Sequence, residues 1–125
     1  MASLGTMTAT FTEVTRAVCA PEELFDLSLS IDTHVESMAR SGERAVAGVT
    51  SGAIGLGESV TWRARHFGIV WTMTSRITAL ERPHRFVDEQ VRGPFRSFRH
   101  EHRFERDGDL TVMTDTVTLR SPLFG

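Results

Sequence analysis

The stretch that decides the fold is Arg82–Leu119, which reads RPHRFVDEQVRGPFRSFRHEHRFERDGDLTVMTDTVTL. It contains three runs typical of β-strands, separated by turn signals at Arg92-Gly93-Pro94 and at Asp107-Gly108. Several polar residues in these runs alternate in step with apolar ones, so they belong to the same face. How the three strands pair therefore determines what these polar residues can do.

The parity of the side chains selects one pairing for these strands. A two-residue turn at Asp107-Gly108 predicts His100 opposite Asp115. A three-residue loop at Arg92-Gly93-Pro94 predicts Phe86 opposite His100, whereas an even loop would separate the aromatic residues, because a slip of one residue turns every side chain over. The predicted inner face carries Phe86, Asp88, Gln90, Phe98, His100, His102, Phe104, Met113, Asp115, Val117 and Leu119. The predicted outer face of the middle strand carries Ser97, Arg99, Glu101, Arg103 and Glu105, a pattern typical of solvent.

A second hairpin precedes this stretch. Val60–Phe67 and Ile69–Leu80 alternate apolar and polar side chains, and Phe67-Gly68 has the length of a two-residue turn. That turn predicts His66 opposite Ile69, so that the apolar faces of the two strands coincide. The inner-face residues of this hairpin are then Val60, Trp62, Ala64, His66, Ile69, Trp71, Met73, Ser75 and Ile77.

The first half of the chain predicts two strands and two short helices. Phe11–Val18 is rich in β-branched residues, but Phe11 and Val14 have opposite parity and leave its inward face open. A helix is expected from Pro21 through the apolar stripe Leu24, Phe25, Leu27 and Leu29, and a second over Ile31–Ala39. Ala45–Thr50 predicts the other strand, and Gly52, Gly55 and Gly57 then mark a connection without a nucleotide-binding fingerprint.

Composition restricts the class of protein. The chain has 125 residues, enough for one domain, and its formal net charge of −2 argues against a nucleic-acid partner. It has no apolar run of roughly 18 residues and no secretory signal, so we expect no membrane span. A single cysteine, Cys19, suits a reducing compartment, and we expect a cytoplasmic protein. A second methionine at Met7 suggests a leader over residues 1–8, with the domain at 9–125.

These patterns predict an α+β fold: a seven-stranded antiparallel sheet with two short helices after the first strand. The order of elements, together with VTWRARHFG (60–68), RPHRFVDEQ (82–90), GPFRSFRHEHRF (93–104) and TVMTDTV (111–117), resembles the START-like superfamily. More narrowly, the chain is similar to polyketide cyclase/dehydrase-like (SRPBCC) ligand-binding proteins. The resemblance implies a helix-grip fold, in which a curved sheet grips a long C-terminal helix over an apolar cavity.

The chain departs from this family at SPLFG (121–125), where the gripping helix is expected to begin. We therefore expect a domain that is truncated at or before that helix. An uncovered sheet exposes apolar surface, so a homodimer that covers the open face is a further hypothesis.

The inner face predicts a site for a small hydrophobic or lipid-like molecule, because apolar walls with few polar groups are typical of such pockets. The expected ligand-binding residues are Trp62, His66, Trp71, Met73, Phe86, Asp88, Gln90, Phe98, His100, His102, Phe104 and Met113. An alternative is a cyclase/dehydrase-type enzyme with His100 and Asp115 as an acid–base pair, since a carboxylate behind an imidazole raises its basicity. A metal site at His100 and His102 is the third alternative, but no spacing forces a further ligand, and we expect neither metal nor cofactor.

Overall fold

The computed structural model describes residues 7–37, 42–66 and 68–121, and the side chains of Ser37 and His66 are not described. The elements in chain order are β1 (Thr8–Ala17), α1 (Pro21–Ser28), α2 (Ile31–Ser37), β2 (Arg44–Gly48), β3 (Ser59–His66), β4 (Ile69–Glu81), β5 (Arg85–Arg92), β6 (Ser97–Asp107) and β7 (Leu110–Arg120). The predicted order of strands and helices is confirmed. Ala39, the expected end of the second helix, lies outside the described residues.

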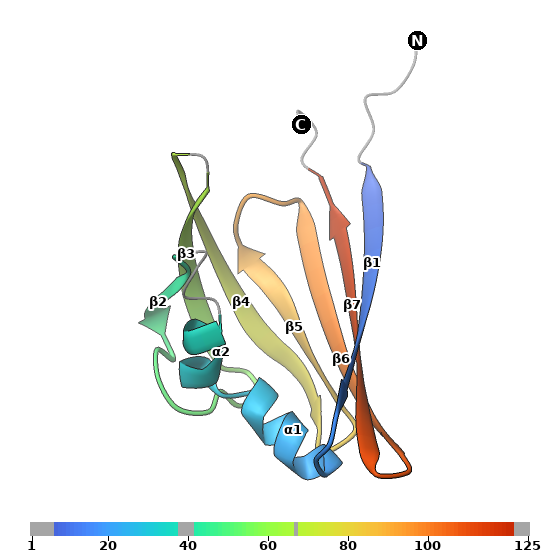
Figure 1. Ribbon diagram of the computed structural model, residues 1–125. Helices are drawn as coiled ribbons and strands as arrows, with labels where there is room; N and C mark the ends of the chain where they lie inside the picture. The colour runs from blue at the N-terminus through green and yellow to red at the C-terminus, as the bar shows by residue number, and fades with distance from the viewer. Residues whose placement is uncertain (1–6, 38–41, 67, 122–125) are drawn as a thin grey trace.

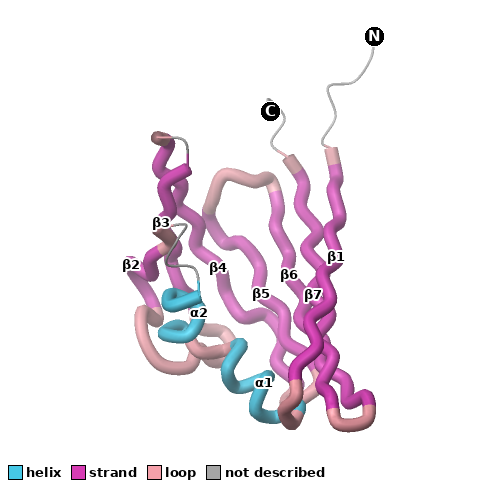
Figure 2. Tube along the Cα trace, viewed as in Figure 1, coloured by secondary structure: helices cyan, strands magenta, loops and turns pink. Residues whose placement is uncertain are grey.

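The seven strands form one curved antiparallel sheet in the order β1-β7-β6-β5-β4-β3-β2. Consecutive strands from β2 to β7 are neighbours, and β1 closes the far edge by pairing with β7. Both helices lie against one face, at the end of the sheet away from the start of β1 and the end of β7 (Figure 1). Figure 2 shows that the helices cover only part of that face. Within the described residues, no long helix follows β7.

The core lies between the helices and the covered end of the sheet. Phe25 of α1 is fully buried and packs edge-on against Phe86 and Phe104, with ring centroids 5.5 and 5.2 Å away. Burying a side chain of this size stabilises the fold by about 2 kcal/mol relative to exposure. The remaining buried core residues are Leu29, Ile31, Ile54, Val60 and Ile77. Phe86 and Phe104 are therefore fixed by α1.

The β3–β4 hairpin has the predicted register, with His66 opposite Ile69 and Trp62 opposite Met73. The predicted pairings on the other strands were wrong by two residues. Phe86 lies opposite His102 instead of His100, and His102 lies opposite Asp115 instead of Met113. A shift of two residues preserves the side-chain alternation, so the predicted inner and outer faces are both confirmed.

The turn chemistry explains both shifts. In the β6–β7 hairpin Asp107 pairs with Leu110, so the turn residues are Gly108 and Asp109, and Gly108 has the positive φ of 60° that such a turn needs. In the β5–β6 connection the side chain of Gln90 donates to the carbonyl of Phe95 at 2.7 Å and accepts from its N–H at 3.3 Å. Residues 93–96 form this longer connection, which Gln90 holds in place.

The glycine-rich connection between β2 and β3 docks into the core. Its backbone joins the helices through the N–H of Ile54, which donates to the carbonyl of Leu29, and the N–H of Ile31, which donates to that of Gly52. Ile54 is only 5% exposed. Alternation along the strands did not reveal this role, because Ile54 lies outside them.

The close approach of Gly48, at the end of β2, to the neighbouring strand can be tested by substitution. Its φ is +73°, and a Cβ there would meet the carbonyl oxygen of Ser59 on the neighbouring strand. We expect Gly48→Ala to lower the free energy of unfolding by more than about 2 kcal/mol, from left-handed backbone strain together with the clash. The control is Gly52→Ala, because Gly52 has φ +71° and open space around it, which leaves only the strain of about 1 kcal/mol. Urea unfolding measures both, and equal losses would contradict the clash.

Candidate functional site

Four hollows that share walls follow the inner face of the sheet. The central hollow, of about 300 Å³, lies between the helices and the middle strands, and its walls include Ile31, Trp62, Met73, Phe98 and His100. The aromatic hollow, of about 200 Å³, continues from it across Trp62 and Met73 to Trp71 and Phe95. Two side hollows lie toward β7 and β1, the first lined by His102, Met113 and Asp115 and the second by Phe11, His100 and Asp115. The inner face is therefore a continuous trough.

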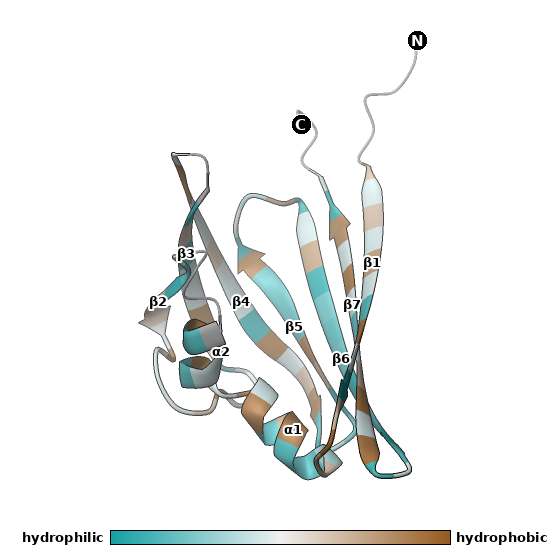
Figure 3. Cartoon of the chain, in the orientation of Figure 1, coloured by the Kyte–Doolittle hydropathy of each residue, from teal (hydrophilic) through white to brown (hydrophobic). Residues whose placement is uncertain are grey.

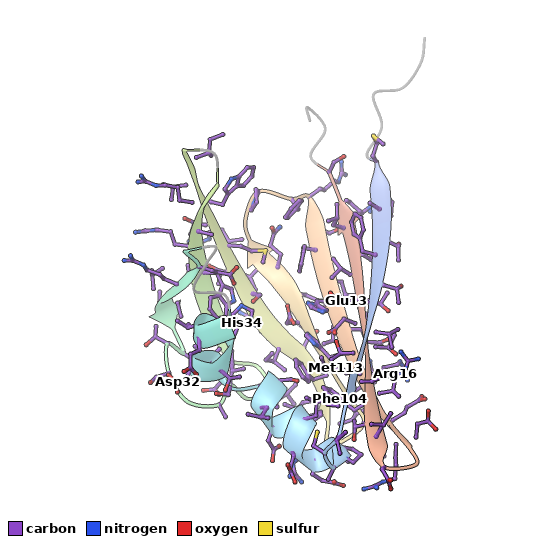
Figure 4. The ribbon with its side chains drawn as sticks, in the orientation of Figure 1. Glu13, Arg16, Asp32, His34, Phe104 and Met113 are labelled. Atoms are coloured by element: carbon purple, nitrogen blue, oxygen red, sulfur yellow. The ribbon has the colours of Figure 1, made fainter. Side chains whose placement is uncertain are left out.

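The aromatic hollow is mainly apolar. Trp62, Trp71, Met73, Pro94 and Phe95 line it, and Glu43 is its charged residue among those described. Trp71 is 43% exposed, and the ring of Trp62 lies against that of His34 of α2 at a centroid distance of 4.3 Å and a tilt of 38°. His34 in turn bonds Glu43 at 2.7 Å. Figure 4 shows His34 reaching from α2 toward the sheet.

A cluster of polar side chains, the Asp–His network, forms the floor where β5, β6 and β7 meet. It consists of Asp88, His100, His102 and Asp115. His102 Nε2 lies 2.9 Å from Asp88 Oδ2 and its Nδ1 lies 2.8 Å from Asp115 Oδ1. His100 Nε2 lies 2.9 Å from the same oxygen of Asp115. In Figure 3 much of β5 and β6 is coloured teal, at the hydrophilic end of the scale.

The two carboxylates define the protonation state of His102. Carboxylate oxygens only accept hydrogen bonds, so His102 can bond both Asp88 and Asp115 only when both of its ring nitrogens carry a proton. Burial opposes this charge, but the hydrogen bonds to Asp115 and Asp88 outweigh burial and raise the pKa of His102. His102 is therefore an imidazolium held between two carboxylates.

Stacking fixes the plane of this ring. His102 lies between Phe86 and His100, with centroid distances of 4.0 and 3.7 Å and interplanar angles of 16° and 21°. At Asp115, burial favours the neutral acid, but the hydrogen bonds from His100 and His102 outweigh burial and lower the pKa of the Asp115 carboxyl. The network is thus preorganised and charged.

The structure brings most of the predicted ligand-binding residues to the trough. Among them, Trp62, Trp71, Met73, Phe86, Asp88, Phe98, His100, His102 and Met113 line one or more hollows. Phe86 is only 2% exposed, so it lies in the floor of the central hollow and has little surface for a ligand to contact. Phe104 packs in the core against Phe25, and Gln90 holds the β5–β6 connection. The side chain of His66 lies outside the described residues.

Several wall residues were not identified from the sequence. His34 lies three positions after Ile31 and so shares the inward face of α2, a helical spacing that could have revealed it. Glu43 and Phe95 lie in connections, where alternation gives no signal. Glu13 lies opposite Asp115 because the β1 register turns Phe11 and Glu13 inward, which the sequence had left open.

The network also contains a possible set of metal ligands. One ligand atom from each of Asp88, His100 and His102 lies within 4.8 Å of the others. However, His102 uses both ring nitrogens as donors to carboxylates, so a metal would have to displace a proton from it. The arrangement suits proton binding as it stands.

On the outer face of the sheet, two arginines share one carboxylate, that of Glu101. Arg85 lies 3.0 Å and Arg103 2.9 Å from carboxylate oxygens of Glu101. Burial raises the pKa of Glu101, but the hydrogen bonds from Arg103 and Arg85 outweigh it, so that this pKa is lowered. This cluster of Glu101 with Arg85 and Arg103 therefore lies on the face away from the trough.

Comparisons with known proteins place the fold. No family model matches the chain, and no curated protein matches it in sequence. Solved structures do match. Mll3558 from Rhizobium loti has a TM-score of 0.73 at 14% identity, covering 93% of this chain and 81% of its own. Ginseng major latex-like protein 151 from Panax ginseng has a TM-score of 0.66 at 16% identity, covering 90% and 78%.

Norcoclaurine synthase from Thalictrum flavum, solved with dopamine and hydroxybenzaldehyde, has a TM-score of 0.69 at 9% identity, covering 95% of this chain and 73% of its own. These neighbours are Bet v 1-like members of the START/SRPBCC helix-grip superfamily. The chain has their fold, and the predicted fold class is confirmed. None of its described helices is long and apolar enough to cross a membrane.

The raised pKa of His102 has a measurable consequence. Its contribution to stability is complete below the ordinary histidine pKa of about 6.5 and is lost as the pH rises through the folded-state pKa. The contribution of Asp115, whose pKa is lowered, is complete above the ordinary value of about 4 and is lost as the pH falls through the folded-state pKa. Both residues therefore contribute fully to stability between about pH 4 and 6.5.

We therefore expect His102→Gln to lower the free energy of unfolding by about 3 kcal/mol at pH 5.5 and by less at pH 9. Urea unfolding at both pH values measures this, and an NMR titration of the His102 ring should give a pKa above 6.5 in the native protein. The control is His84→Gln, because His84 is an exposed turn residue. A His102 ring that titrates below 6.5 would contradict the ion-pair assignment.

Proposed function

We propose that this protein binds a small, mainly apolar molecule in the trough along the inner face of its sheet. The observation that carries the proposal is the continuity of the central and aromatic hollows, about 300 and 200 Å³, across the shared walls Trp62 and Met73. Apolar walls with a few orienting polar groups are typical of small-molecule sites. The fold neighbour norcoclaurine synthase, solved with two small aromatic molecules, supports the proposal.

In this proposal the apolar walls and the Asp–His network have different roles in binding. The apolar walls supply most of the binding free energy, because each square ångström of apolar area removed from water contributes about 25 cal/mol. The Asp–His network supplies fixed polar groups on the floor, at Asp88 and His100. A ligand would lie with its apolar body against Trp62 and Met73 and any polar group toward β5 and β6.

Filling the shared wall tests the proposal. We expect Met73→Trp to weaken the binding of a neutral fluorescent probe, phenylnaphthylamine, at least about tenfold, because the larger side chain occupies the space between the two hollows. The matched control is Thr72→Trp, which adds the same bulk at the adjacent, exposed position on the outer face. Fluorescence titration measures the affinities, and native mass spectrometry of protein from cells shows whether an apolar ligand co-purifies. Equal affinities in the two variants would contradict a site in the trough.

A second candidate function is acid–base catalysis of the cyclase/dehydrase type. The contact of 2.9 Å between His100 Nε2 and Asp115 Oδ1 favours it, because a carboxylate orients an imidazole for proton transfer. The catalytic roles of His100 and Asp115 stay a prediction, as do the cytoplasmic location and the homodimer.

The catalytic candidate is separable from simple binding. If the protein turns over its co-purified ligand, we expect His100→Ala to reduce the rate at least about a hundredfold, the usual contribution of a general acid or base. The affinity for phenylnaphthylamine should change by less than about threefold, because His100 contributes only a polar edge to the apolar site. A rate that is unchanged in His100→Ala would remove His100 from the catalytic role.

A further inference from the structure

The charged and titratable residues that line the trough are carboxylates and histidines. All 14 basic residues other than histidine are arginines, since the sequence contains no lysine. None of the arginines that the structure describes lines any of the four hollows. The charged and titratable residues that do line them are Glu13, His34, Glu43, Asp88, His100, His102 and Asp115.

These groups favour a positive charge over a negative one. Four carboxylates line the trough, and the one histidine that must be doubly protonated, His102, already donates to Asp88 and Asp115. The trough is lined by these four carboxylates and by three histidines, so the ionised carboxylates outnumber the imidazoles even when every imidazole carries a proton. An anionic ligand would find no arginine among the described residues that line the trough, and it would face like charges.

Asp88 offers a defined position for the cationic group. One of its oxygens, Oδ2, accepts from His102 Nε2 at 2.9 Å. Its other oxygen, Oδ1, has no hydrogen-bond partner within the described part of the chain, and Asp88 lines the central hollow. An ammonium group donates up to three hydrogen bonds, and bonds between charged partners are about twice as strong as neutral ones.

The walls suit the rest of such a ligand. Trp62 and Met73 line both the central hollow and the aromatic hollow, so a group near Asp88 can be joined past them to a body that lies against Trp71 and Phe95. Aromatic faces attract organic cations through their negative π-clouds, with tryptophan the most effective. Glu43, at the boundary of both hollows, adds a second carboxylate. A strongly hydrated metal ion gains little from such walls.

We infer that the trough selects an organic cation, that is, an amine or alkylammonium group carried on an aromatic or aliphatic body. The inference rests on the proposed function, since it names the class of ligand for the same site. The ammonium group lies at Asp88 in the central hollow, and the body extends past Trp62 into the aromatic hollow.

Three probes that share one body and differ in charge test the inference. Isothermal titration at pH 8 compares naphthylethylamine, ethylnaphthalene and naphthylacetate against the wild-type protein. We expect the amine to bind about tenfold more tightly than the neutral compound, and the acid more weakly than either. Asp88→Asn should reduce the advantage of the amine, whereas Glu89→Gln should not, because Glu89 is the next residue of β5 and faces the outer side opposite Arg99.

The outcomes separate this inference from the function on which it rests. If none of the three probes binds, the proposed function and the inference both fail. If ethylnaphthalene binds as tightly as the amine, or naphthylacetate more tightly, the inference fails and the proposed function stands. Stoichiometric zinc binding that displaces the amine would assign Asp88, His100 and His102 to an inorganic cation and overturn the ammonium assignment. The wild-type comparison decides the question even if Asp88→Asn does not fold.

Discussion

The ion pair of His102 with Asp88 and Asp115 is the interaction on which the inner face of this protein depends. It joins three neighbouring strands through side chains, because Asp88 lies on β5, His102 on β6 and Asp115 on β7. Removing one member of a buried ion pair costs more than the pair itself contributes, since the remaining charge is left without compensation. The three residues therefore act as one unit, and the register of the sheet must bring all of them together.

The sheet separates its charges by face. Arg85 and Arg103 bond Glu101 on the outer side, while the carboxylates of the inner side meet histidines. Arginine stays charged at all accessible pH values, but histidine changes its charge near neutrality. The two faces therefore differ in the kind of cation that meets their carboxylates, arginine on the outer face and histidine on the inner face. The proposed preference of the trough for a cation rests on this composition.

The position of the helices decides which part of the inner face is core and which part is trough. Phe25 of α1 packs against Phe86 and Phe104, so the side chains of the strands that face α1 are buried. Beyond the helices, Trp71 stays 43% exposed and borders a hollow. The fold neighbours show the same architecture at 9 to 16% identity, which means that the architecture tolerates almost complete replacement of its side chains. The proposed function therefore rests on the particular residues of the trough and not on the fold.

The sequence by itself determined the elements and the face to which each strand residue belongs. Alternation has a period of two, so Asp88, His100, His102 and Asp115 share the inner face whatever the turn. The sequence could not determine which of these four residues pair across the strands. Moving the β6–β7 turn by one residue shifts every cross-strand partner by two residues and leaves the alternation unchanged. Only the tertiary structure placed His102 between two carboxylates, through Gly108 in the turn. It also brought in His34 and Glu43, which lie on a helix and a connection whose approach to the sheet depends on core packing rather than on a local pattern.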